Sequence, residues 1–204
     1  MSERPVVLLL GGSTSSGSHT TATIEAAALM LTELGAEPLV WDLAIQPLPI
    51  VDPSCHGRPE LYTDPYARTF AQLAAEADAF LIASPMYRGS CTGAVKNALD
   101  HLDVTPLSGK PVGLLAHGEN LSAVQACDAL RTVVRALRGI ALPEQLVTVP
   151  GDFARSAKGV RVLHTSAARR RLYALCRALV ELAHRLAGTA DPVPAAGPPR
   201  LNGC

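Results

Sequence analysis

Hydroxyl side chains and glycines crowd one ten-residue segment near the start of the chain, residues 11–20, which we call the first loop. It reads Gly-Gly-Ser-Thr-Ser-Ser-Gly-Ser-His-Thr and lies between a short apolar run and an Ala- and Leu-rich helical pattern. Glycines let a backbone turn its N–H groups toward a ligand, and a helix N-terminus adds about half a positive charge. This combination suits a phosphate group. The loop matches neither GxxxxGK[ST] nor GxGxxG, which disfavours a Walker-type nucleotide hydrolase.

A second segment, Ser-Pro-Met-Tyr-Arg-Gly-Ser-Cys-Thr at residues 84–92, follows another apolar run and is called the second loop. Pro85 stiffens its start, and Tyr87 offers an aromatic face with a polar edge. Gly89 lets a flat ligand approach the backbone closely. We therefore expect a planar ligand here. Lys96 and Asp100, four residues apart in the helix predicted next, are expected to form a structural ion pair worth a few tenths of a kcal/mol.

A third segment, Ala-His-Gly-Glu-Asn at residues 116–120, is the third loop. Among the six histidines, only His19 and His117 fall in these three loops. The chain has no HExxH, no GxSxG and no cluster of metal-ligating residues, so the sequence favours neither a metal centre nor a serine hydrolase. We expect no metal and name no residue as catalytic.

Short apolar runs alternate with helical patterns along the chain. Strands are predicted at residues 6–10, 37–41, 79–83, 111–116 and 145–149, and helices at 20–34, 66–77, 92–102, 121–138 and 166–187. Five βα repeats predict an α/β fold, a three-layer sandwich with a five-stranded parallel sheet in the flavodoxin-like order 2-1-3-4-5. In that order strands one and three are neighbours at the point where strand order reverses, so the first and second loops should meet there.

The composition of the chain disfavours several classes of function. The chain has 204 residues, zero net charge and 4% aromatic residues, which argues against nucleic-acid or membrane binding. Five scattered cysteines and no secretion signal favour reduced thiols and a cytoplasmic protein. We expect one domain over residues 1–187 and a disordered tail over 188–204. The loop at 42–65 holds five prolines and is expected to be functional or interfacial.

The segment SPMYRGSCTGAVKNALDHL resembles the signature of the NADPH-dependent FMN reductase family, and the first and third loops resemble the same family's other flavin contacts. The resemblance covers roughly residues 5–150. It implies FMN and NADPH or NADH as cofactors. It also implies flavin contacts at thirteen positions: Ser13, Ser15, Ser18, His19, Thr20, Pro85, Met86, Tyr87, Arg88, Ser90, His117, Gly118 and Glu119.

Within that set, the resemblance assigns Ser13, Ser18 and Thr20 to the FMN phosphate. The second and third loops would line the isoalloxazine ring. The chain departs from the family in three ways. Ser15 stands where the family usually has arginine, Arg88 stands where it often has asparagine, and the third loop carries His117 and Glu119.

The resemblance implies an FMN-dependent NAD(P)H oxidoreductase that passes electrons to a second acceptor, either free flavin or another small molecule. A flavin-dependent monooxygenase is one candidate recipient of reduced flavin. A homodimer or homotetramer is expected. Three alternatives stay open: a quinone, azo or chromate reductase, a flavodoxin-like electron carrier, and a biosynthetic flavoenzyme on the same fold.

Overall fold

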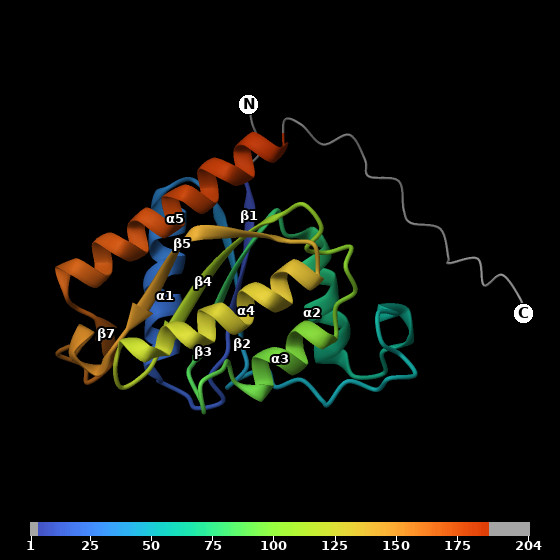
Figure 1. Cartoon of the computed structure of the whole chain (residues 1–204), viewed down its shortest axis with the longest axis horizontal. Coiled ribbons are helices and arrows are strands. Elements are labelled where there is room, and N and C mark those ends of the chain that lie inside the picture. Colours follow the sequence, from blue (N-terminus) through green and yellow to red (C-terminus); the bar gives the residue numbers. More distant parts are fainter. Residues whose placement is uncertain (1–3, 188–204) are drawn as a thin grey trace, which may run out of the picture.

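A computed structural model describes residues 4–187, and the tail predicted at 188–204 lies outside the described residues. A five-stranded parallel sheet forms the centre of the molecule (Figure 1). Its order is β2-β1-β3-β4-β5, as the sequence predicted. The strands are β1 (Val6–Gly11), β2 (Glu37–Asp42), β3 (Ala79–Pro85), β4 (Pro111–His117) and β5 (Ile140–Thr148).

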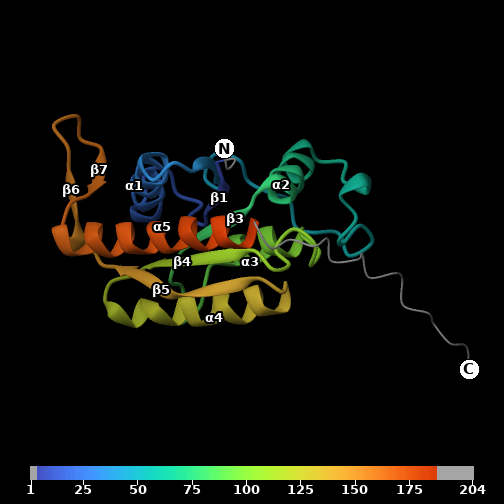
Figure 2. The ribbon, with the colours of Figure 1, turned by 90° about the horizontal axis from the view of Figure 1, so that it is seen from above.

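Helices cover both faces of the sheet (Figure 2). Helices α1 (His19–Glu33) and α5 (Ser166–Ala187) pack on one face. The other face carries α2 (Pro65–Glu76), α3 (Gly93–Asp100) and α4 (Val124–Ala136). Three short 3-10 helices join these elements, at Pro59–Leu61, Leu121–Ala123 and Pro150–Asp152. The fold is a three-layer α/β sandwich of the flavodoxin-like type.

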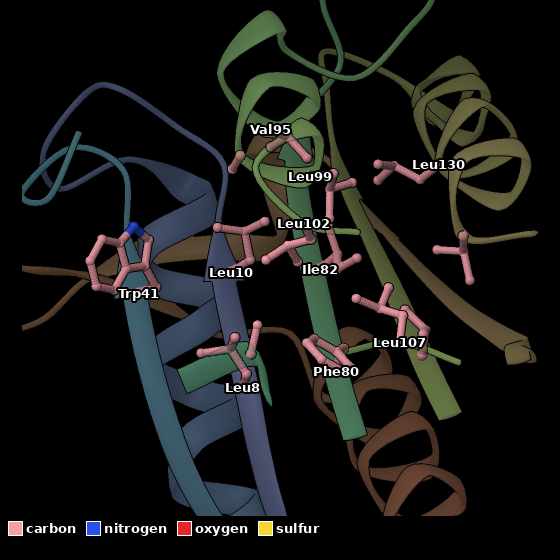
Figure 3. Packing of buried hydrophobic residues seen from close by; sticks show 14 of the residues in the cluster. Leu8, Leu10, Trp41, Phe80, Ile82, Val95, Leu99, Leu102, Leu107 and Leu130 are labelled. Carbon is pink, nitrogen blue, oxygen red and sulfur yellow. The ribbon is translucent and has the colours of Figure 1, made fainter. Parts of the chain in front are cut away.

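Alternation along the strands builds the two cores. Leu8 and Leu10 of β1 face the α2, α3 and α4 side, while Val7 and Leu9 face the α1 and α5 side. Figure 3 shows the first of these cores, where Phe80 and Ile82 of β3 meet residues of α3 and the segment that follows it. Because both faces of β3 are buried over its full length, the sheet is a rigid base for the loops at its carboxyl edge.

The structure departs from the predicted elements in three places. Strand β5 begins at Ile140, five residues earlier than expected, because Pro143 and Glu144 lie in an irregular stretch that interrupts the apolar pattern. Arg131 of α4 supports this stretch by donating to the Leu142 carbonyl oxygen at 2.7 Å. The long helix expected at 121–138 is divided into a 3-10 turn and α4.

A third departure lies between β5 and α5, where the sequence predicted no regular structure. Strands β6 (Phe153–Arg155) and β7 (Arg161–Leu163) form an antiparallel hairpin there. Figure 2 shows it beside α1. No helix in the described residues is long and apolar enough to cross a membrane.

Candidate functional site

The first loop leaves β1 and enters α1 at the carboxyl edge of the sheet. The Gly12 N–H donates to the Ala83 carbonyl oxygen at 2.8 Å, which extends the pairing between β1 and β3 beyond the strand end. A Cβ at Gly12 would lie 2.5 Å from that oxygen and 1.9 Å from Val95 Cγ2. Only glycine fits so close an approach, so the loop starts from a fixed position. Ser18 ends it as the N-cap of α1, accepting from the Thr21 N–H at 3.0 Å.

Backbone donors in this loop are free for a ligand. Within the described part of the chain, the N–H groups of Gly17, Ser18 and His19 donate to no protein acceptor. Gly17 has a positive φ of 62°, and a Cβ there would meet nothing within 4 Å. Turned N–H groups in open space at a helix N-terminus are the features that bind phosphate.

Thr20 adds a second unsatisfied group to the same region. Its hydroxyl is buried and has no hydrogen-bond partner in the described structure. It borders a narrow crevice between α1 and the ends of β3, β4 and β5, which His117 and Thr148 also line. A buried hydroxyl without a partner costs free energy, so a ligand that bonds to it would bind more tightly.

The second loop folds as a tight two-residue hairpin. Tyr87 and Ser90 exchange both backbone hydrogen bonds, at 2.9 and 3.1 Å. The turn between them places Arg88 and Gly89 at φ of 52° and 78°. This pair of positive angles is the type I′ geometry, which suits Gly at the second position and is uncommon for Arg at the first. Backbone strain of this kind concentrates at functional sites. The Tyr87 side chain is 59% exposed and therefore accessible to a ligand.

Hydrogen bonds hold the loops together. Thr92, the N-cap of α3, donates its hydroxyl to the Gly12 carbonyl oxygen at 2.8 Å, and its N–H donates to Ser84 Oγ at 2.9 Å. The Met86 N–H donates to the His117 carbonyl oxygen at 2.7 Å. The first loop is thus bonded to the second, and the second to the third, so the three form one surface.

His117 stacks on His19 with ring centroids 4.1 Å apart and an interplanar angle of 22°. Burial, the adjacent His19 and the Arg161 charge lower the pKa of His117 to about 4. Burial and Arg161 also lower the pKa of His19, and Glu119 partly opposes them. Both rings are therefore neutral near pH 7. Thr148 Oγ1 lies 3.1 Å from His117 Nδ1 and 3.3 Å from the Ala116 carbonyl oxygen, so a hydrogen bond to Thr148 fixes the orientation of the His117 ring.

Two residues near these loops lie on the hairpin that the sequence did not predict. Phe153 of β6 packs edge-on against both histidine rings, at 4.7 Å from His19 and 5.5 Å from His117. Arg161 of β7 donates from Nη1 to the Gly17 carbonyl oxygen in the first loop. A sequence separation of 144 residues left no local signal for this contact.

The predicted residues differ in what their side chains do. Ser13 is buried and turned into the loop, where its Oγ accepts from the Ser15 N–H at 3.2 Å. Ser18 Oγ serves as the helix cap. Tyr87, Arg88 and Glu119 are exposed at the edge of the site. The remaining predicted residues lie in the same three loops: Ser15, His19, Thr20, Pro85, Met86, Ser90, His117 and Gly118.

A separate groove of about 690 Å³ runs between α1, β7 and α5. Leu29, Tyr173 and Arg170 are among its lining residues. Arg161 of β7 also borders this groove, but most of the lining comes from the flanks of α1 and α5 rather than from the carboxyl ends of the sheet strands, so we assign the groove no part in the candidate site.

The sheet is open and parallel, and its strand order reverses between β1 and β3. At that point one loop offers free N–H donors and the next is open to a flat ligand. These features are typical of flavodoxin-like proteins that bind a phosphorylated planar cofactor. The sequence profile of the NADPH-dependent FMN reductases matches residues 5–154. An FMN-dependent NADPH-azoreductase of Staphylococcus saprophyticus is 37% identical over 157 residues, covering 76% of this chain and 83% of the relative. The chain belongs to the NADPH-dependent FMN reductase family, and is thus an oxidoreductase that uses FMN and NAD(P)H.

Solved structures agree on the fold. An oxidoreductase from Corynebacterium diphtheriae aligns with a TM-score of 0.67 at 18% identity, covering 90% of this chain and 99% of that one. The apo form of an NADH:FMN oxidoreductase aligns with a TM-score of 0.66 at 21% identity, covering 87% and 89%.

Proposed function

We propose that the three loops hold FMN, with its phosphate in the first loop and its isoalloxazine ring between the second and third loops. The observation that carries this proposal is the set of free N–H groups around Gly17 at the start of α1. The bonds from Thr92 to Gly12 and from Met86 to His117 support it, because they keep the three loops in a fixed relation.

Within this arrangement, the chain's residues bind, orient and exclude water. The Tyr87–Ser90 hairpin presents backbone groups at a strained turn, where the edge of a flat ring can hydrogen-bond. The His19 and His117 rings are neutral and pack against Phe153. Together they form a weakly hydrated surface that excludes water from one side of the proposed site. When bound, FMN would supply the redox chemistry, namely hydride transfer from NAD(P)H and electron transfer to a second acceptor. No side chain is required as an acid or base for that transfer.

The second acceptor is a small molecule, and we propose that it is an aromatic compound of the azo or quinone class. The similarity to a staphylococcal azoreductase supports this choice. The exposed face of Tyr87 supports it too, since an aromatic acceptor can stack there. Free flavin, with a flavin-dependent monooxygenase as its recipient, is the second candidate.

Acceptor kinetics test the proposal. The purified protein should show the absorption spectrum of bound FMN, and NADPH or NADH added without oxygen should bleach it. A carboxylated azo dye and a quinone should then be turned over faster than free riboflavin. Faster turnover of riboflavin would reverse the choice of acceptor. Failure of both nicotinamides to bleach the flavin would favour the electron-carrier alternative.

A pair of glycine variants tests the second loop. Gly89→Ala places a side chain at a φ of 78° and 3.0 Å from Gln125 Oε1, so we expect weaker FMN binding. Gly109→Ala is the matched control, because Gly109 has a φ of 72° but precedes β4, at the opposite edge of the sheet. Both variants carry similar backbone strain. Equal FMN affinities in the two would remove the second loop from the site.

Assembly and location complete the proposal. The proline-rich segment at 42–65 exposes Ile45 and Ile50, at 70% and 84%. We propose that this segment forms the interface of a homodimer, because exposed aliphatic side chains in one loop commonly mark a contact surface.

A cytoplasmic location is supported by the described cysteines, which are free thiols. We also propose that residues 1–187 form one domain.

A further inference from the structure

The first loop lacks a charge that its proposed ligand calls for. Residues 11–20 contain no lysine and no arginine. The phosphate monoester of FMN carries between one and two negative charges near pH 7. Hydrogen bonds from a charged donor are roughly twice as strong as those from a neutral one, so a phosphate site without a cation gives up much of its affinity.

The β6–β7 hairpin delivers a cation to this loop from a distant part of the chain. Asp152 joins the two segments that flank the hairpin, because its carboxylate accepts from the Thr165 hydroxyl at 2.7 Å and from the Val149 N–H at 2.9 Å. Phe153 packs against the histidine rings and fixes the side of the hairpin that faces α1. From β7, Arg161 reaches the first loop and donates to the Gly17 carbonyl oxygen.

This contact controls which way one peptide group points. In a trans peptide the carbonyl and the following N–H point in opposite directions. By holding the Gly17 carbonyl, Arg161 turns the Ser18 N–H away from itself and away from the hairpin. That N–H has no acceptor in the described structure. If the peptide flipped, a carbonyl oxygen would replace this donor and repel an anion.

Arg161 differs in this respect from the other arginines of the hairpin region. Arg155 donates to the Gly159 carbonyl within the hairpin turn at 2.7 Å, and Arg169 lies 3.4 Å from the Leu163 carbonyl at its base. The Arg161 charge is also felt by His19 and His117, whose pKa values it lowers. Arg161 lies beyond the region that the family profile matches, which ends at residue 154.

We propose that Arg161 is the cation of the phosphate site. It holds the Gly17 carbonyl outside the loop, aims the Ser18 N–H at the ligand, and offsets the charge of the FMN phosphate. It acts as a positioning residue and not as a catalytic one. This inference rests on the proposed assignment of the FMN phosphate to the first loop.

Paired affinities for FMN and riboflavin test the inference, because riboflavin has the same ring without the phosphate. Fluorescence quenching gives both dissociation constants on the apoprotein. Arg161→Gln should weaken FMN binding at least tenfold and change riboflavin binding by less than about twofold, since a charge-assisted interaction is lost only with the phosphate. Arg161→Lys should restore most of the FMN affinity. Arg155→Gln, on the same hairpin, should leave both affinities unchanged.

Salt dependence supplies a second readout, in which the native protein is compared with Arg161→Gln. Raising ionic strength should weaken FMN binding to the native protein more than to Arg161→Gln, because salt screens the attraction between the Arg161 charge and the phosphate. Equal losses for FMN and riboflavin in Arg161→Gln would overturn the inference and leave Arg161 as a brace between hairpin and loop. An unchanged FMN affinity would also overturn it. A native protein that binds riboflavin as tightly as FMN would instead overturn the assignment of the first loop itself.

Discussion

Ser18→Asp is a sharp perturbation of the first loop because it changes charge while keeping the helix cap. Ser18 Oγ accepts from the Thr21 N–H at 3.0 Å, and aspartate is as good an N-cap as serine. The chain already uses Asp64 in the same role at the start of α2, where it accepts from Ala67 N–H at 2.9 Å. Helix α1 should therefore form normally in the variant.

The expected loss follows from charge repulsion at the helix N-terminus. A carboxylate about 5 Å from a phosphate, at an effective dielectric constant of about 40 for a half-exposed position, is disfavoured by about 1.7 kcal/mol per unit of phosphate charge. With about 1.5 to 2 charges on the phosphate, the total is roughly 2.5–3.3 kcal/mol. At about 1.4 kcal/mol per tenfold, FMN should bind roughly a hundredfold more weakly.

Ser18→Asn is the matched control, because it caps the helix without adding charge. Fluorescence quenching with FMN and riboflavin on native protein, Ser18→Asp and Ser18→Asn gives six affinities. Only FMN on Ser18→Asp should fall. A similar fall for riboflavin would show that the variant distorts the loop, and an undiminished FMN affinity would refute the placement of the phosphate beside Ser18.

Three further outcomes are expected. Gly12→Ala should destabilise the fold by about 2 kcal/mol or more, because its Cβ would lie 2.5 Å from a backbone oxygen, whereas Gly93→Ala, with nothing within 4 Å, should have little effect in thermal unfolding. Because the pKa of His117 is lowered to about 4 from 6.5, the unfolded chain binds that proton more tightly; stability should therefore fall as pH drops from about 6.5 to about 4, and less steeply in His117→Gln, as urea titrations at several pH values would show. Light scattering should give twice the 21.3 kDa chain mass for native protein and a shift toward the single-chain mass for Ile50→Asp; a native protein of 21.3 kDa at micromolar concentration would contradict the proposed dimer.

The sheet could be predicted because its signals are local and repeated. Each strand is a short apolar run, and right-handed βα crossovers leave few possible orders for five of them. The closing helix was predicted with its observed bounds, Ser166–Ala187, because its leucines recur at three- and four-residue intervals. Strand β5 was predicted too short because the irregular stretch around Pro143 depends on pairing with β4 and on support from Arg131, both distant in sequence.

The place of the first loop in the fold could also be predicted from local signals. Gly12 and Gly17 indicate a turn between a strand and a helix, so the position of the first loop can be predicted from residue types alone. The individual side-chain roles are not. Ser18 Oγ accepts from the Thr21 N–H as the helix cap, and the free backbone N–H of Ser18 is a further donor that residue type alone does not reveal. The His19–His117 stack joins residues 98 positions apart and has no local pattern.

The β6–β7 hairpin carries a positive charge that the sequence of the first loop lacks. Ser15 marks a missing arginine in the first loop, and that observation alone suggests a weakened phosphate site. The folded chain places Arg161 against the Gly17 carbonyl of the same loop. Strands β6 and β7 have three residues each, too few for a recognisable alternation, and their position depends on Asp152 and Phe153. If Arg161 is the cation of the proposed phosphate site, it can be found only in the folded chain, because so short an element leaves no pattern in the sequence. The charge of the proposed site is therefore assessed from the residues that lie near it in space and not from the sequence of the loop alone.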